Sequence, residues 1–279
     1  MKTDEKINRS NTVSRLEALK EYLLRLLFPP KCIICKDLLT ESSEMCPECL
    51  KVWKGARLSR CPVCQKTARN CTCSTFHLLS TDITSNKRLT ALAFYGKFGS
   101  DDKKDILVRK LIYEIKTSTD RSAVRFAARE LSHELLKVLI LAGEDPKQWK
   151  ITYPPRSKSR IRKYGFDHGL DLARAISGYT AIPFEKALEN SGKSAQKSLN
   201  SLERKNNAKA SYSIIEGFSP SEKYIICDDV VTTGATVNTA AEILKSAGAK
   251  QVLPICIARS KKKKRRVRRM AENPWFRSK

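Results

Sequence analysis

Residues 224–236, YIICDDVVTTGAT, decide the fold of this chain. The first four residues form an apolar run that is too short for a helix and is typical of a buried parallel strand. Asp228 and Asp229 follow as the start of a polar loop, and residues 237–244 then show a helical pattern before a second apolar run at 252–258. This order of strand, loop, helix and strand predicts an α/β fold with an open parallel sheet that binds ligands at the carboxyl ends of its strands.

The polar loop has the composition of a sugar-phosphate site. A phosphate needs backbone N–H groups from small residues, a helix N-terminus and hydroxyl donors, which Gly234, Ala235 and three threonines supply. The carboxylates of Asp228 and Asp229 offer acceptors for two neighbouring ribose hydroxyls. Paired aspartates can also end a strand and cap the next helix, but the threonine–glycine run after them favours the sugar phosphate.

The stretch resembles the phosphoribosyl-diphosphate (PRPP) loop of type I phosphoribosyltransferases, which has four apolar residues, two acidic residues and a threonine–glycine phosphate loop. The resemblance implies that Asp228 and Asp229 hold the ribose 2′- and 3′-hydroxyls. It also implies that the 5′-phosphate is wrapped by Val231, Thr232, Thr233, Gly234, Ala235 and Thr236. Purine-salvage members often carry an aspartate in place of Thr232, so 6-oxopurine salvage is disfavoured.

Composition sets the broad class of the protein. The chain has 279 residues, enough for one full-sized core and a small module. Its net charge of +25 predicts anionic partners, either phosphorylated ligands or nucleic acid. No apolar run approaches the roughly 20 residues of a membrane helix, and the polar N-terminus shows no secretory signal. We therefore expect a cytoplasmic, reducing location without membrane insertion, which argues against disulfides among the ten cysteines.

Eight of these cysteines lie between residues 32 and 73. A Cys-x2-Cys pair places two thiolates on one tight turn, and two such turns complete a closed tetrahedral Zn–S4 site that leaves no open position for catalysis. Bound metal would hold so short a segment together. The expected ligands of one or two structural zinc ions are Cys32, Cys35, Cys46 and Cys49, followed by Cys61, Cys64, Cys71 and Cys73. We favour this sequential pairing, while cross-braced pairing stays open and His77 is close enough to replace a weak ligand.

The remaining segments follow from shifts in pattern. Residues 1–28 predict a disordered start and an amphipathic helix, which we expect to pack on its own protein rather than on a membrane. A double zinc ribbon is expected at 29–75, a phosphoribosyltransferase-like domain at 88–260 and a basic disordered tail at 261–279. Within the domain, the patterns predict strands at 89–95 and 151–153 and helices at 106–116 and 123–141. The five cations at 156–163 favour an electropositive lip over a diphosphate rather than a merely solvated face.

Together these motifs resemble the ComF family (competence protein F, also called the GntX-like phosphoribosyltransferases) over about residues 27–260. The family pattern has an apolar helix, a PP-x-C double zinc ribbon, a helix ending in lysine, VP, R-x-R-x-x-GFNQ, Q-x-x-L-x-x-x-x-R-x-x-N and DDVxTTGAT. The matching stretches here are LLFPPKC, the eight cysteines, 111–116, 153–154, 160–168, 196–207 and 228–236. Two departures stand out: Asp167 and His168 replace the Asn and Gln of GFNQ, and Tyr153 replaces the valine.

The resemblance implies a glycosyltransferase reaction in which a nitrogen nucleophile displaces diphosphate from ribose C1 through an oxocarbenium-like state. Mg²⁺ would bridge oxygens of the diphosphate and the ribose. The diphosphate side would consist of Tyr153, Pro154, Pro155 and Arg156, and Arg156 and Lys116 are the candidate catalytic residues for charge stabilisation. No residue is identifiable as a general base, and the acceptor base is not specified by the sequence.

The family context implies cytoplasmic handling of incoming single-stranded DNA during natural transformation, beside a helicase-like partner. The alternative is a non-catalytic module that senses PRPP or a nucleotide, while its ribbons and basic segments contact DNA or a partner protein. Residues 261–269 carry eight cations, and Trp275 and Phe276 follow as rings on which unpaired bases could stack. We therefore expect the tail to favour single strands. A regulator of duplex DNA is a weaker hypothesis, since no recognition-helix motif is visible.

Overall fold

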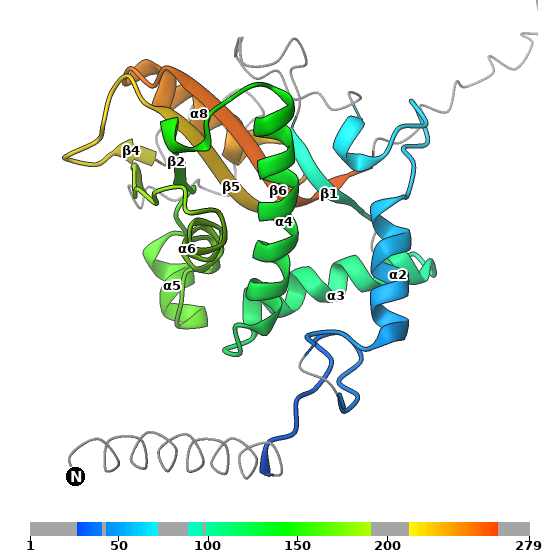
Figure 1. Cartoon of the computed structure of the whole chain (residues 1–279). Coiled ribbons are helices and arrows are strands. Elements are labelled where there is room, and N and C mark those ends of the chain that lie inside the picture. Colours follow the sequence, from blue (N-terminus) through cyan, green and yellow to red (C-terminus); the bar gives the residue numbers. More distant parts are fainter. Residues whose placement is uncertain (1–26, 41–42, 72–88, 97–98, 191–211, 262–279) are drawn as a thin grey trace, which may run out of the picture.

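A four-stranded sheet forms the centre of the structure, a computed structural model that describes residues 27–40, 43–71, 89–96, 99–190 and 212–261. Its strand order is β1-β6-β5-β2, and all neighbouring strands are parallel (Figure 1). The strands are β1 (Thr90–Tyr95), β2 (Trp149–Thr152), β5 (Lys223–Val231) and β6 (Gln251–Ser260). The predicted α/β class with an open parallel sheet is thus confirmed.

Helices cover both faces of this sheet, which explains why its inner strands read as continuous apolar runs. One face carries α3 (Lys103–Thr117), α4 (Ser122–Leu141) and α6 (His168–Thr180), and the opposite face carries α8 (Ala235–Ser246) (Figure 1). Each helix buries one stripe of apolar residues, as the spacing in the sequence predicts. The remaining elements are α2 (Pro47–Arg57), α5 (Lys158–Tyr164), the 3₁₀ helices η1 (Ala68–Asn70) and η2 (Pro146–Gln148), and the antiparallel pair β3 (Leu188–Asn190) and β4 (Tyr212–Ile214).

The strand that carries the acidic pair is longer than its apolar run predicts. β5 pairs with β6 as far as Val231 opposite Arg259, so Asp228 and Asp229 lie within the strand rather than at the start of a loop. The expectation that the acidic pair begins the loop is therefore wrong. Its cause is the register with β6, which keeps the backbone extended for four residues beyond Cys227.

The first cysteine segment packs directly on the large domain. Cys32, Met45 and Trp53 share one continuous apolar core with residues of α3 and α4. The Trp53 ring meets the Phe126 ring edge-on at 5.6 Å, and its Nε1 donates to Glu130 at 2.9 Å. The segment is therefore fastened to α4 by both apolar and polar contacts.

Several sequence-based predictions concern residues outside the described ranges. These are the helix before residue 27, the linker at 74–88, Cys73, His77, the segment 196–207 and the tail beyond Lys261. Among the residues that are described, no helix combines the length and the apolar character needed to cross a membrane.

Candidate functional site

The acidic pair lies near the carboxyl end of β5, where the ends of α3 and α6 meet it. Asp229 is 5% exposed, and its Oδ2 atom lies 2.9 Å from Nζ of Lys116 and 3.2 Å from Nε2 of His168. Lys116 comes from the last turn of α3, and His168 is the first residue of α6. The second carboxylate oxygen of Asp229 accepts a hydrogen bond from the backbone N–H of Val230 at 2.7 Å. Three elements that are distant in the sequence therefore converge on one buried carboxylate.

These contacts separate the protonation behaviour of the two neighbouring aspartates. Burial raises the pKa of Asp229, but the hydrogen bond and charge of His168 and the charge of Lys116 outweigh it and hold that pKa well below its usual range. Burial and the charge of Asp229 raise the pKa of Asp228 well above its ordinary value. Asp229 is therefore the carboxylate that stays ionised, while Asp228 takes up a proton more readily.

The threonine–glycine loop follows directly and leads into α8. Gly234 has a φ of 83°, in the left-handed region that favours glycine, and α8 begins at the next residue. Thr232, Thr233 and Thr236 are exposed, and the first turn of α8 contains no acidic residue. The positive end of the helix is thus open to an anion, as a phosphate-binding loop requires.

The loop after β2 forms the opposite side of the site. Because β2 pairs with β5, residues 153–156 leave the sheet at the same edge as the acidic pair. Burial lowers the pKa of the Arg156 guanidinium, against the opposing charges of Asp229 and Asp167. Its Nη1 atom is buried without a hydrogen-bond partner among the described residues. A desolvated cation of this kind is suited to an anionic ligand.

Two neighbours of Arg156 differ in what they offer a ligand. The Tyr153 side chain is 3% exposed and its ring stacks on Phe184 with centroids 6.2 Å apart, so it belongs to the core. The cations of α5 are exposed, and the charge of Arg160 contributes to lowering the pKa of Arg156. The charged residues of α5 therefore lie close enough to act on this side of the site, in keeping with the expected electropositive lip.

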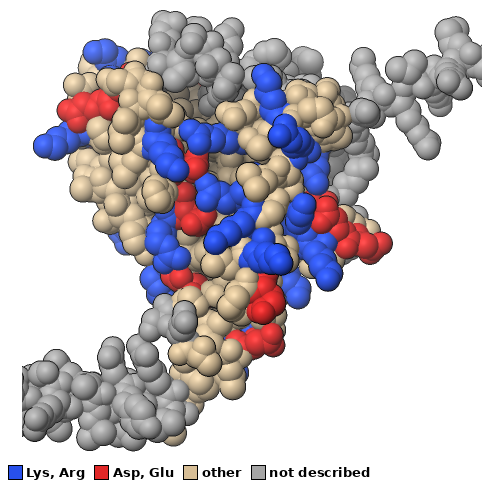
Figure 2. All heavy atoms as spheres, turned by 45° about the vertical axis from the view of Figure 1, so that its right-hand side comes forward, with Lys and Arg blue, Asp and Glu red and all other residues tan. Residues whose placement is uncertain are grey.

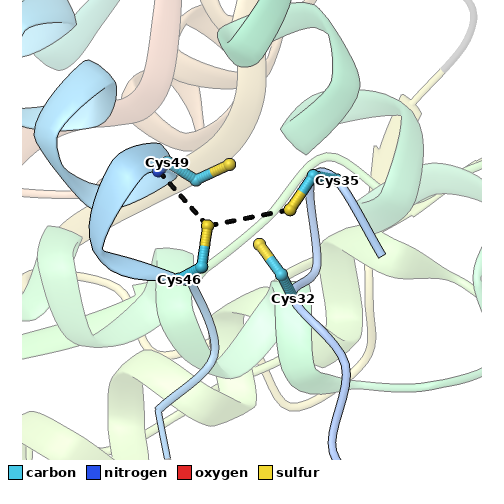
Figure 3. A group of neighbouring side chains, drawn as sticks. All are labelled: Cys32, Cys35, Cys46 and Cys49. Carbon is cyan, nitrogen blue, oxygen red and sulfur yellow. Dashed lines mark hydrogen bonds between the residues drawn. The ribbon is translucent and has the colours of Figure 1, made fainter. Parts of the chain in front are cut away.

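The first cysteine set forms a compact cluster (Figure 3). The sulfur atoms of Cys32, Cys35, Cys46 and Cys49 all lie within 4.8 Å of one another. Hydrogen bonds from backbone N–H groups outweigh the effect of burial and lower the pKa of Cys32 to about 7. Four converging thiols with backbone donors fit the S4 ligand set of structural zinc.

The second set forms a separate cluster, which packs in the apolar core that includes α8 rather than in the core of α3 and α4. The sulfur atoms of Cys61, Cys64 and Cys71 lie within 4.8 Å of one another, and Cys73 is outside the described residues. The described cysteines are thus grouped as sequential pairing predicts, with Cys32 and Cys35 apart from Cys61 and Cys64. The carbonyl of Cys71 accepts a hydrogen bond of 2.7 Å from Nη1 of Arg259, which is 2% exposed in β6.

Comparison with known proteins agrees with this combination of modules. The family model described as phosphoribosyl transferase domain matches residues 189–276. Competence protein ComFC of Streptococcus pneumoniae (strain ATCC BAA-255 / R6) is 26% identical over 251 residues, which cover 82% of this chain and 100% of that relative. The chain resembles the ComF family. Like that relative it is matched over most of its length, and a phosphoribosyl transferase domain follows two cysteine clusters.

Solved structures show only distant likenesses to this chain. The allosteric regulatory enzyme of purine biosynthesis is 16% identical with a TM-score of 0.35, and covers 52% of this chain and 30% of its own. The glutamine PRPP amidotransferase from B. subtilis is 17% identical with a TM-score of 0.34, over 52% of this chain and 30% of that chain. This chain thus spans 30% of the length of each of these two structures.

The structure assembles the predicted site residues of this chain unevenly. The acidic pair, the threonine–glycine loop and Arg156 lie around one edge of the sheet. Lys116, expected at the diphosphate, pairs with Asp229 in the structure. Sequence reasoning noted Asp167 and His168 only as departures from the family pattern near the predicted diphosphate side, and did not predict their contacts on the buried side of the site. The available signal was an aspartate directly before a helical pattern, which predicts an N-cap.

Proposed function

We propose that this protein binds PRPP or a related nucleotide, together with Mg²⁺, at the edge formed by β5, β2 and α8. The observation that carries the proposal is the juxtaposition of the ionised, buried Asp229 with the open N-terminus of α8, which begins at Ala235, six residues further along the chain. In this arrangement, residues 231–236 would bind the 5′-phosphate, and Asp228 and Asp229 would accept hydrogen bonds from the ribose hydroxyls. Arg156 would face the diphosphate.

The residues around the acidic pair fit a ligand that brings its own metal ion. Mg²⁺ usually keeps several waters and binds through substrate phosphates with few protein ligands. In this site the ionised carboxylate of Asp229 would supply the negative charge beside the ion. Its chemistry there would be to neutralise the leaving diphosphate.

The residues of the chain would act on this ligand by positioning and by charge. The carboxylate of Asp229 would orient the ribose, while Lys116 and Arg156 would stabilise charge that develops on the diphosphate as its bond to C1 breaks. Lys116 can reach a ligand only by sharing or leaving its contact with Asp229. The nitrogen nucleophile is the acceptor base, and no described residue is assigned as its general base. The reaction class is therefore transfer of a phosphoribosyl group.

Isotope-labelled PRPP tests this proposal with the full chain and Mg²⁺. Release of labelled diphosphate in the presence of one of a panel of nucleobases would support the transferase, and the responding base would identify the acceptor. Saturable PRPP binding without release would support the alternative, a non-catalytic sensor of PRPP or a nucleotide. No binding of PRPP or nucleoside monophosphates would contradict both.

We further propose that the protein handles single-stranded DNA in the cytoplasm during DNA uptake, in keeping with the name of its curated relative. Figure 2, with the side that carries α2 and α3 turned forward, shows Lys and Arg side chains spread over this face. The exposed lysines of these two helices are Lys51, Lys54, Lys103, Lys104 and Lys110. The predicted basic tail would extend such a surface, and a helicase-like competence protein is a possible partner.

Salt titration of oligonucleotide binding tests the DNA proposal. Replacing these five lysines with alanine should reduce the slope of log affinity against log salt concentration by up to about 3.5, since each phosphate contact on a single strand contributes about 0.7. Removing residues 262–279 should flatten the slope further. Both variants should bind PRPP as the unchanged chain does. Unchanged slopes in both would contradict DNA binding through these segments.

A further inference from the structure

We propose that Asp167 is a specificity-determining residue of the proposed phosphoribosyl site, because its buried carboxylate occupies backbone donors on the diphosphate side. The site would then favour a 5′-phosphoribosyl ligand with little negative charge near ribose C1, such as a nucleoside monophosphate, over PRPP. This inference rests on the proposed function and names the ligand class of the same site.

The contacts of Asp167 place it between the two sides of the site. Its Oδ2 atom accepts a hydrogen bond of 3.1 Å from the backbone N–H of Arg156, in the loop after β2. Its Oδ1 atom accepts one of 3.2 Å from the N–H of Gly169, in the first turn of α6. The side chain is 9% exposed, and the next residue, His168, contacts Asp229. A loop amide and a helix N-terminus, both ordinary donors for an anionic oxygen, therefore face a carboxylate of the protein itself.

The charges around Arg156 show what this carboxylate does. Asp167 and Asp229 both act on the Arg156 guanidinium with opposite charge, Arg160 acts on it with like charge, and Lys116 is bound to Asp229. The described part of the site thus contains acidic groups that already balance its inner cations. A diphosphate would add negative charge beside Asp167, and like charges at short range oppose binding. A ligand without the diphosphate would not meet this repulsion.

Asp167→Asn tests the proposal with little change in shape. Asparagine is as good an N-cap as aspartate, so its single acceptor oxygen can keep the bond from Gly169 N–H. It cannot also accept from Arg156 N–H with a second oxygen, which would free that donor for a ligand. The variant therefore removes the negative charge and exposes one amide in a single step.

Equilibrium binding of Mg²⁺–PRPP and of ribose 5-phosphate should be measured by calorimetry for the unchanged chain and for D167N. The two probes share the 5′-phosphate and the ring hydroxyls, and only PRPP carries the diphosphate. We expect D167N to bind PRPP about tenfold more tightly, the order of effect of one nearby like charge at the high effective dielectric of a protein surface. Its affinity for ribose 5-phosphate should change less than about twofold.

Asp102→Asn is the matched control. Asp102 is also an N-cap aspartate and is exposed at the start of α3, at the opposite end of that helix from Lys116. This variant makes the same change in net charge and should leave both affinities as they were. Thermal melts of both variants would confirm that the caps are retained.

The outcomes separate this inference from the proposed function. Tighter binding of PRPP by D167N alone supports the specificity role. Binding of both probes with an unchanged affinity ratio in D167N overturns that role and leaves the proposed function standing. An equal gain in D102N overturns it as well, because general charge would then explain the effect. Failure of every protein to bind either probe overturns the proposed function, and the inference falls with it.

Discussion

The first cysteine cluster and the acidic site are both compact groups of ionisable side chains, but the chain assembles them in opposite ways. The cluster takes all four thiols from residues 32–49, so its members are neighbours in the sequence. The acidic site brings Lys116 and His168 to Asp229 from the ends of two helices, and only the folded sheet holds them together. A metal ion can organise the first group locally, whereas the second depends on the whole domain.

Removing metal from the clusters should have the largest effect. Because the first cluster shares its apolar core with α3 and α4, a chelator or Cys32→Ser should destabilise the entire chain. We expect a fall in melting temperature of about 10 °C, corresponding to roughly 3 kcal/mol for a domain of this size. Trp53 lies in α2 and Trp149 in β2, so Trp53→Phe and Trp149→Phe variants, each combined with Trp275→Phe, allow each region to be followed by fluorescence.

Because the first cluster shares its apolar core with α3 and α4, the Trp53 and Trp149 signals should change in a single unfolding transition. Loss of the Trp53 signal at a lower temperature than the Trp149 signal would show that the cysteine module unfolds by itself. Metal analysis of the purified chain gives the number of bound zinc ions. Two zinc ions per chain are expected from two S4 sites.

Asp229→Asn should have a smaller effect on stability and a large one on ligand binding. The substitution removes the charge that orients Lys116 and His168 and the acceptor proposed for the ribose. We expect affinity for Mg²⁺–PRPP to fall by at least about thirtyfold, the loss of a charge-assisted hydrogen bond of about 2 kcal/mol. Zinc content should not change, which separates the two regions.

The matched control for this variant is Asp145→Asn. Asp145 is exposed at the start of η2, just before β2 and therefore at the opposite edge of the sheet. It should leave PRPP affinity unchanged. Equal losses in the two variants would assign the effect to net charge rather than to the acidic site.

The smallest expected effect is the dependence of stability on pH. The pKa of Asp229 is lowered in the folded state, so its contribution is present above the ordinary carboxyl pKa of about 4 and is lost as pH falls through the folded value. Asp228 has a raised pKa and therefore opposes stability as pH rises. Lys116→Met removes one partner of Asp229 and leaves the Asp228 environment largely in place.

Denaturation of the unchanged chain and of K116M should be compared from pH 7 to as far below pH 3 as the chain stays folded. We expect K116M to be about 1 kcal/mol less stable at pH 7, since Lys116 is partly exposed and its charge is screened by solvent. The difference should persist down to about pH 3 and shrink only below it, as the pH falls through the lowered folded pKa of Asp229. A difference that stays constant at the lowest pH would assign the loss to packing of the lysine stem instead.

Local pattern was sufficient to predict much of the fold and part of the site. Apolar spacing located the four strands of the sheet and the helices α3, α4 and α8, and the cysteine spacing favoured the two clusters in which the described cysteines lie. The acidic pair and the threonine–glycine loop after it were recognisable because a strand end followed by a helix start is itself a short local structure. These features share one property, namely that the residues concerned are close in sequence.

Contacts between distant segments were not predictable in this way. Periodicity shows that Trp53 faces an apolar surface, but not that this surface is α4. The same limit applies to Lys116 and His168, whose common partner is Asp229, and to the depth at which Asp229 is buried. Sequence patterns predict which face of a helix or strand is buried. Only the packing around the sheet determines which other element covers that face.

The hydrogen bond between Arg259 and the carbonyl of Cys71 joins residues 188 positions apart. The cysteine segment is synthesised before the rest of the domain. All of its thiols are therefore present long before Arg259 in β6, which binds the Cys71 carbonyl, has been made. At the usual 5–20 residues per second, Arg259 follows Cys71 after about 10–40 seconds. During that interval the surfaces of Trp53 and Met45 that later pack on the domain are exposed on the growing chain. Synthesis in a cell short of zinc would extend this exposure to the cysteine turns themselves, and would make aggregation during translation the first consequence of zinc limitation.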